Sequence, residues 1–111
     1  MAKQSATLRK IVALKRQSAE QHLRAVQIEA DRIETVIAAL RAQFLELDHL
    51  RAGFDAHRLS EAHGHVRKLL ADIGAAEAEL ARKHADLHAA REAVKRVFHS
   101  EERLGQARPA G

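Results

Sequence analysis

"LRAVQIEADRIETVIAALRAQFLEL", the stretch from Leu23 to Leu47, decides the fold class, because its apolar residues recur at alternating steps of three and four. With Leu23 as position a of a heptad, the a and d residues are Leu23, Val26, Ala30, Ile33, Ile37, Leu40, Phe44 and Leu47. This spacing is typical of a coiled-coil seam, which is narrower than the apolar stripe of a globular helix. Extended backwards, the register meets Ala19, Arg16, Val12 and Arg9, so the seam becomes basic toward the N-terminus.

A second series with the same spacing follows after a short break. It comprises Leu59, Ala62, Val66, Leu69, Ile73, Ala76, Leu80, Lys83, Leu87, Ala90, Val94, Val97, Glu101 and Leu104. Between the two series lies "GFDAHRLS", where we predict Gly53 as a left-handed helix C-cap, Asp55 bonded to its own turn, and Ser60 as the next N-cap. The chain is therefore predicted to be one helical hairpin, residues 1–111. Its parts are helix 1 at 6–52, a turn at 53–60, helix 2 at 61–104 and a disordered tail at 105–111.

Two seams joined by so short a connection should run antiparallel, which sets a positions against d positions in layers. The apolar layers would pair Phe44 with Leu69, Leu40 with Ile73, Ile37 with Ala76, Ile33 with Leu80, and Val26 with Leu87. Ala30 meets Lys83, and nearer the chain ends Val12 meets Glu101 and Arg16 meets Val97. We predict an all-α fold, an antiparallel two-helix coiled-coil hairpin forming a rod of roughly 70 Å at 1.5 Å per residue.

The composition agrees with long helices and excludes several classes of protein. The chain has 111 residues, of which 46% are hydrophobic but only 3% aromatic, and it has no cysteine. Disulfides, cysteine metal sites and thiol nucleophiles are therefore excluded. The longest wholly apolar run, Val36 to Leu40, is far short of the roughly 20 residues that span a bilayer. No phosphate loop, nucleophile elbow or zinc-protease motif occurs, so we expect no enzymatic activity.

Eight histidines raise the question of a metal site. His84 and His88 are spaced i, i+4 on one helix and could hold a divalent cation, while His57, His63 and His65 cluster near the turn. No obvious further ligand completes either set. We therefore interpret these histidines as solvated side chains and expect neither a metal nor a cofactor.

The charge is unevenly distributed along the chain. The net charge is +4, but residues 1–25 carry +5, residues 91–111 carry +2 and the remainder carries −3. In an antiparallel hairpin both basic segments lie at the same end. That end also has apolar residues outside the seam, with Leu8, Ile11 and Leu14 at g, c and f and Phe98 at e. Apolar groups rimmed by cations often mark a contact surface.

Three kinds of partner differ in how well they fit the residues of this end. Nucleic acid is disfavoured, because the basic start of the first helix has no aromatic side chain for stacking and the rod has no short recognition helix. A membrane surface is disfavoured too, because Lys15 interrupts the apolar arc and the seam uses Val12. A surrounding protein explains both the apolar groups and the cations, since the cations can meet acidic residues.

The sequence resembles the FliJ/YscO family, the coiled-coil stalk proteins of flagellar and injectisome type III export machines. The resemblance lies in "LRKIVALKRQSAEQHLRAVQIEADRIETVIAAL", which begins at Leu8, and in the return helix "LSEAHGHVRKLLADIGAAEAELARKHADLHAAREAVKRV", which begins at Leu59. It implies a cytoplasmic stalk whose paired chain ends insert into a hexameric export ATPase ring. The residues implied to dock in the ring are Leu8, Arg9, Lys10, Ile11, Lys15, Arg16, Lys95, Arg96 and Phe98.

The resemblance also implies an export gate membrane protein as a second partner, and export chaperones as further ones. The surface facing the gate would include Leu45, Leu50 and Leu70, which lie off the seam. No nucleic acid and no direct membrane insertion are expected. Two alternatives stay open: an export chaperone that binds a secreted subunit as an extra helix, and a structural protein that dimerises into a four-helix bundle through Val36, Leu50 and Leu70.

Overall fold

The computed structural model describes residues 2–106, and it confirms the all-α class. Helix α1 spans Ala2–Leu50, a short 3-10 helix η1 spans Arg51–Gly53, and helix α2 spans Ala56–Gln106. The predicted boundaries need correction, since α2 begins five residues before position 61. Gly105 and Gln106, which were predicted to be disordered, continue α2. The remainder of the predicted tail, 107–111, lies outside the described residues.

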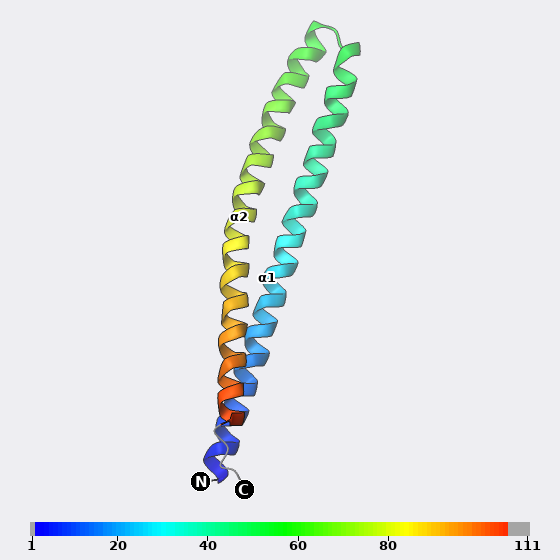
Figure 1. The fold of residues 1–111 in the computed structure, drawn as a ribbon. Coiled ribbons are helices and arrows are strands. Elements are labelled where there is room, and N and C mark those ends of the chain that lie inside the picture. The colour runs from blue at the N-terminus through cyan, green and yellow to red at the C-terminus, as the bar shows by residue number, and fades with distance from the viewer. Residues whose placement is uncertain (1, 107–111) are drawn as a thin grey trace. The chain divides into compact units, whose positions relative to one another are not determined.

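The chain divides into two compact units. We call Met1–Ile28 with His84–Gly111 the terminal unit, and Glu29–Lys83 the turn unit. Each unit pairs a segment of α1 with an antiparallel segment of α2. In the terminal unit, the last turns of α2 lie beside α1, and the first turn of α1 extends past the end of α2 (Figure 1). The turn unit is a helical hairpin closed by η1.

The seam predicted along α1 is confirmed by burial. From Arg9 to Leu47, every predicted seam residue is buried or half-buried, whereas all other described side chains of α1 are exposed. The most deeply buried members are Val26, Ala30, Ile33 and Ile37. Ile33 is only 2% exposed. Because burial of apolar surface is the main stabilising contribution, this narrow stripe stabilises α1 against α2 in both units.

The seam of α2 follows the prediction with one exception. From Ala62 to Leu104 every predicted position is buried or half-buried, and Ala62, Leu69 and Ala90 are the most deeply buried ones. Leu59 was predicted to belong to the seam but is 43% exposed. In each predicted layer the two residue numbers sum to 113, and this layer arithmetic places Phe54 opposite Leu59. Phe54 lies beyond the end of α1, so no helix covers this position.

The turn is built differently from the prediction. Gly53 lies in η1 and its φ is outside the left-handed region, so it is not a left-handed cap. Phe54 is extended, with φ −90° and ψ 141°. The Asp55 Oδ1 atom accepts a hydrogen bond of 2.8 Å from the backbone N–H of Arg58. Asp55 is therefore the N-cap of α2, and Ser60 lies inside the helix.

Ion pairs cross between the helices of the turn unit beside the seam. Arg41 Nη2 lies 2.7 Å from Glu77 Oε1, and Lys83 Nζ lies 3.4 Å from Glu29 Oε2. Lys83 occupies a seam position with its side chain 27% exposed. Its aliphatic stem can thus cover the layer with Ala30 while the ammonium group reaches a carboxylate at the edge.

Candidate functional site

The terminal unit holds all nine residues predicted to dock in a ring, and it concentrates the positive charge. Over its whole sequence it has eleven Lys and Arg against five Asp and Glu, a net charge of +6. The turn unit has eight against ten, a net charge of −2. The electrostatic field of this uneven charge distribution favours an acidic partner at the terminal unit.

The apolar residues predicted to lie outside the seam are exposed in the structure. Leu8, Ile11, Leu14 and Phe98 have exposed fractions of 50%, 43%, 64% and 52%. Their heptad positions explain this exposure, because g, c and f of α1 and e of α2 do not face the opposing helix. They therefore form an apolar surface that this chain leaves uncovered.

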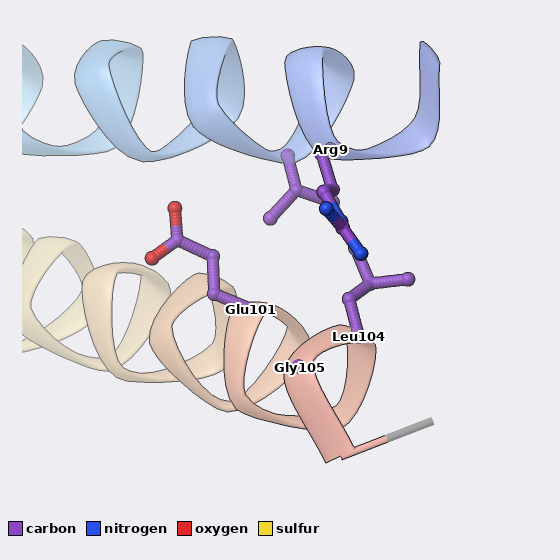
Figure 2. Close-up of a pocket in the computed structure, with 5 residues that line it drawn as sticks. Arg9, Glu101, Leu104 and Gly105 are labelled. Carbon is purple, nitrogen blue, oxygen red and sulfur yellow. The ribbon is translucent and has the colours of Figure 1, made fainter. Parts of the chain in front are cut away.

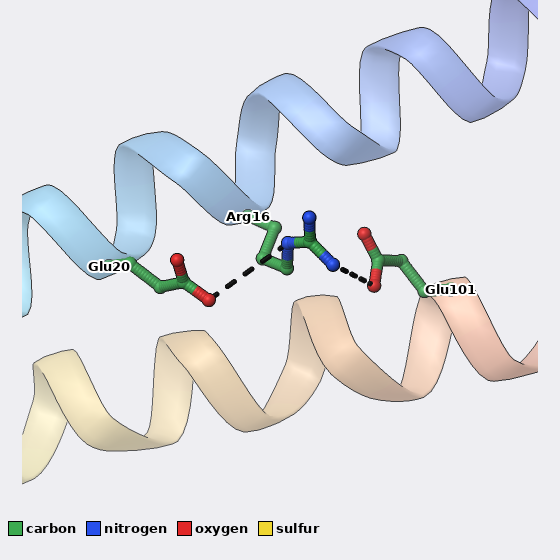
Figure 3. Close-up of polar contacts among 3 residues, drawn as sticks. All are labelled: Arg16, Glu20 and Glu101. Carbon is green, nitrogen blue, oxygen red and sulfur yellow. Dashed lines mark hydrogen bonds and ion pairs between the residues drawn. The ribbon is translucent and has the colours of Figure 1, made fainter.

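The predicted cations fall into two groups in the structure. Arg16 is engaged within the chain: its Nη1 lies 3.1 Å from Glu101 Oε2 and its Nε lies 3.9 Å from Glu20 Oε1 (Figure 3). Lys95 Nζ lies 3.2 Å from Glu92 Oε1. These two cations are already balanced by local carboxylates.

The other four predicted cations have no such partner. Within residues 2–106, none of them takes part in an ion pair; they are Arg9, Lys10, Lys15 and Arg96. Arg9 is half-buried, and the other three are exposed. They are therefore the cations that can meet the carboxylates of another molecule.

A cavity of about 300 Å³ opens between α1 and α2 in the terminal unit (Figure 2). It is lined by Arg9, Val12, Glu101, Leu104 and Gly105. The lining confirms the predicted pairing of Val12 with Glu101. Arg9 extends from α1 toward Leu104 on α2. The sequence interpretation missed Leu104 and Gly105 as site residues, although Leu104 pairs with Arg9 by the same layer arithmetic.

A second hollow lies on α1 alone. It measures about 440 Å³ and is lined by Lys10, Ala13, Leu14, Arg16, Gln17 and Glu20. Leu14 is the most exposed of the four apolar residues of the terminal unit. The hollow places this leucine beside a cation, Lys10, that has no ion pair in the described chain. This part of α1 thus places an exposed apolar side chain next to an unpaired cation.

The predicted gate-facing leucines are all exposed, but they do not share one face. Leu45, Leu50 and Leu70 have exposed fractions of 66%, 52% and 53%. In the heptad register, Leu45 and Leu70 lie on the flank that carries the Arg41–Glu77 ion pair. Leu50 lies on the opposite flank, at a g position. The hairpin therefore groups Leu45 with Leu70 and separates both from Leu50.

The histidines remain side chains of the helix surface. Among the described residues, no group of three or more His, Cys, Asp or Glu side chains is arranged to hold a metal ion. Near the turn, His57 Nε2 lies 3.0 Å from Glu61 Oε1, one helical turn further on. None of the described helices combines the length and apolar character that crossing a membrane requires.

Comparison with family models, with curated proteins and with solved structures found no match to this chain. The class of protein is thus defined by the fold and the site themselves. It is a two-helix coiled-coil hairpin whose terminal unit is basic and has uncovered apolar groups.

Proposed function

We propose that this chain is a non-enzymatic stalk or coupling protein of a type III protein export apparatus. Its terminal unit docks inside the hexameric ring of the export ATPase, and its turn unit contacts the export gate. The observation that carries this proposal is the presence of exposed apolar groups together with unpaired cations in the terminal unit. The sequence resemblance to the FliJ/YscO family supplies the identity of the partners.

The placement of the apolar groups favours a partner that surrounds the unit. Leu8, Ile11 and Leu14 lie at g, c and f, which are neighbouring positions on one face of α1, whereas Phe98 lies at e of α2, on the opposite flank of the antiparallel pair. A lipid bilayer or a groove on one protein covers one flank and leaves the other exposed. A ring encloses every side of an inserted hairpin end, so it can cover all four.

The unpaired cations favour acidic residues on the inner surface of that ring. Arg9, Lys10, Lys15 and Arg96 provide four positive charges for which no described residue provides a carboxylate. Opposite charge across an interface speeds association and fixes orientation, while the apolar groups contribute through burial. Arg16 has an internal role in this proposal, because its guanidinium is held by Glu101 and Glu20.

The turn unit would carry the contact with the export gate, and the protein would work in the cytoplasm beside the membrane apparatus. Leu45 and Leu70 are the residues we assign to this contact, because they share one flank. Leu50 is left out of it. The docking cations lie in the terminal unit and Leu45 and Leu70 lie in the turn unit, which fits a protein that couples two partners.

The test is a set of three charge reversals, Lys10→Glu, Lys15→Glu and Arg96→Glu, in one variant. We expect unchanged helicity by circular dichroism but loss of co-elution with the export ATPase and of stimulated ATP hydrolysis. The matched control reverses Arg67, Lys68 and Arg82 to Glu in the turn unit, which causes the same change in net charge. Stimulation that survives the first variant, or fails equally in both, contradicts the proposed docking.

A further inference from the structure

The cavity of the terminal unit has two kinds of wall. Val12 and Leu104 provide aliphatic surface from opposite helices. Gly105 adds no side chain, and a Cβ atom placed there would have no neighbour within 4 Å. Arg9 and Glu101 provide the charged part of the lining (Figure 2). The cavity is therefore open and has both apolar and charged residues in its lining.

The two charged residues of the lining differ in whether their side chains already have a partner of opposite charge. Glu101 already accepts a hydrogen bond of 3.1 Å from Arg16 Nη1. Arg9 is half-buried and, within the described residues, its guanidinium makes no hydrogen bond or ion pair. A guanidinium that is partly withdrawn from water gains from a charge-assisted hydrogen bond to an anion. The cavity thus has an unmatched cation.

The size of the cavity limits what can enter it. Its volume of about 300 Å³ is at the lower end of the range for ligand pockets, roughly 300–1,000 Å³. One or two side chains fill such a space, whereas a nucleotide or a lipid needs more. A free phosphate could meet Arg9 but would leave the Val12 and Leu104 surfaces against water, so it matches only half of the lining.

We infer that this cavity binds a pair of side chains from an acidic protein segment, an Asp or Glu next to a Leu, Ile or Met. The carboxylate meets the Arg9 guanidinium, and the aliphatic side chain enters between Val12 and Leu104. Charge complementarity supports this occupant. The carboxylate matches the single guanidinium of Arg9, and the acidic segment matches the +6 charge of the whole unit. The inference rests on the proposed function and names the chemistry of the ring segment that this unit would contact.

The experiment titrates the isotopically labelled full chain with three capped peptides and follows the amide signals of Val12, Leu104 and Gly105 by NMR. The peptides are Gly-Ser-Glu-Leu-Gly-Ser, the same peptide with Gln for Glu, and the same peptide with Ser for Leu. We expect the first to bind at least about tenfold more tightly than either of the others, since a hydrogen bond to a charged group and the burial of a leucine side chain each account for such a factor.

Two variants and one control locate the binding. Arg9→Gln should abolish the preference for Glu over Gln, and Gly105→Leu should fill the cavity and weaken all three peptides. Arg24→Gln removes an exposed cation of α1 outside the cavity and should leave the preference intact. Equal binding of the three peptides, or a preference that survives Arg9→Gln, overturns the inference.

The same variants separate this inference from the proposed function. If Gly105→Leu loses peptide binding but still stimulates the export ATPase fully, the ring does not use the cavity. That result overturns the assignment of the cavity to the ring contact and leaves the stalk proposal standing. If the wild-type chain shows the Arg9-dependent preference but does not bind the ATPase, the stalk proposal fails while the cavity remains a site for acidic and apolar side chains.

Discussion

Arg16 and Glu101 are 85 positions apart in the sequence, yet the Arg16 Nη1 and Glu101 Oε2 atoms lie 3.1 Å apart. Both occupy seam positions of the terminal unit, where an apolar layer would otherwise be expected. Arg16 also reaches Glu20 on its own helix, so one guanidinium links two carboxylates (Figure 3). At the polar end of the seam, an ion pair thus takes the place of apolar packing.

Removing this bridge should destabilise the terminal unit only slightly. The Arg16 side chain is 43% exposed and that of Glu101 is 25% exposed, so water screens the pair. We expect a coupling free energy of about 0.2–1 kcal/mol from a double-mutant cycle with Arg16→Gln and Glu101→Gln. Urea denaturation followed by circular dichroism measures it.

Glu102→Gln is the matched control for that cycle. Glu102 is the next residue along α2, and its recorded contact, 3.6 Å to His99 Nδ1, lies within one helical turn. It should show no coupling to Arg16→Gln. A coupling as large as that of Glu101 would mean that the effect comes from net charge and not from the bridge.

Truncation of two isoleucines of α1 should change the free energy of unfolding by very different amounts. Ile33→Ala removes a side chain that is 2% exposed and should cost about 2–5 kcal/mol in the free energy of unfolding, because it leaves a void in the seam. Ile28→Ala removes one that is 59% exposed and should change it by no more than about 0.5 kcal/mol. Chemical denaturation of the two variants makes the comparison, and similar losses would show that the seam register is wrong.

Two glycines inside α2 weaken the helix without a packing reason. A Cβ atom at Gly64 or Gly74 would have no neighbour within 4 Å, and neither φ is left-handed. Replacing each by Ala should therefore stabilise the protein by about 0.5–1 kcal/mol, through the smaller entropy loss of the backbone. The melting temperature should rise by several degrees for the double variant. A fall would indicate that another molecule packs closely on these positions.

The first turn of α2 should depend on Asp55 and not on Ser60. Asp55→Ala removes the acceptor of the Arg58 N–H bond and should cost about 0.5–2 kcal/mol, the usual loss for an N-cap. Ser60 lies inside the helix, so Ser60→Ala should be neutral or slightly stabilising. Amide hydrogen exchange in residues 56–60 reports the difference directly. The reverse order of effects would place the helix start at the serine.

Most of the fold could be predicted because burial repeats with the heptad. The a and d positions from Leu23 to Leu47 needed no knowledge of the partner helix, since the periodicity alone marks the buried side. The turn was less predictable. Asp55 and Ser60 are both good N-caps, and the choice depends on which backbone N–H group each side chain reaches. Leu59 was misassigned for a related reason, because the opposing helix ends before reaching it.

The candidate site was predicted only in outline. The exposure of Leu8, Leu14 and Phe98 follows from their register, so the sequence was sufficient for these residues. The division of the cations was not predictable. Layer arithmetic sets Arg16 against Val97, but the long arginine side chain reaches one turn further to Glu101. Such reach depends on rotamers, which the periodicity of a sequence does not specify.

Lys83 also decides how the two helices can be aligned. In the observed alignment its ammonium group finds Glu29 at 3.4 Å. Sliding one helix past the other by one heptad would keep every a opposite a d, so the apolar residues alone do not exclude it. A slip in one direction would set Lys83 against Ile37 and put Val36 in the place of Glu29. A slip in the other direction would set Lys83 against Leu23 and put His22 in the place of Glu29. A single lysine in the seam thus penalises the slipped pairings and makes the hairpin resistant to sliding under load.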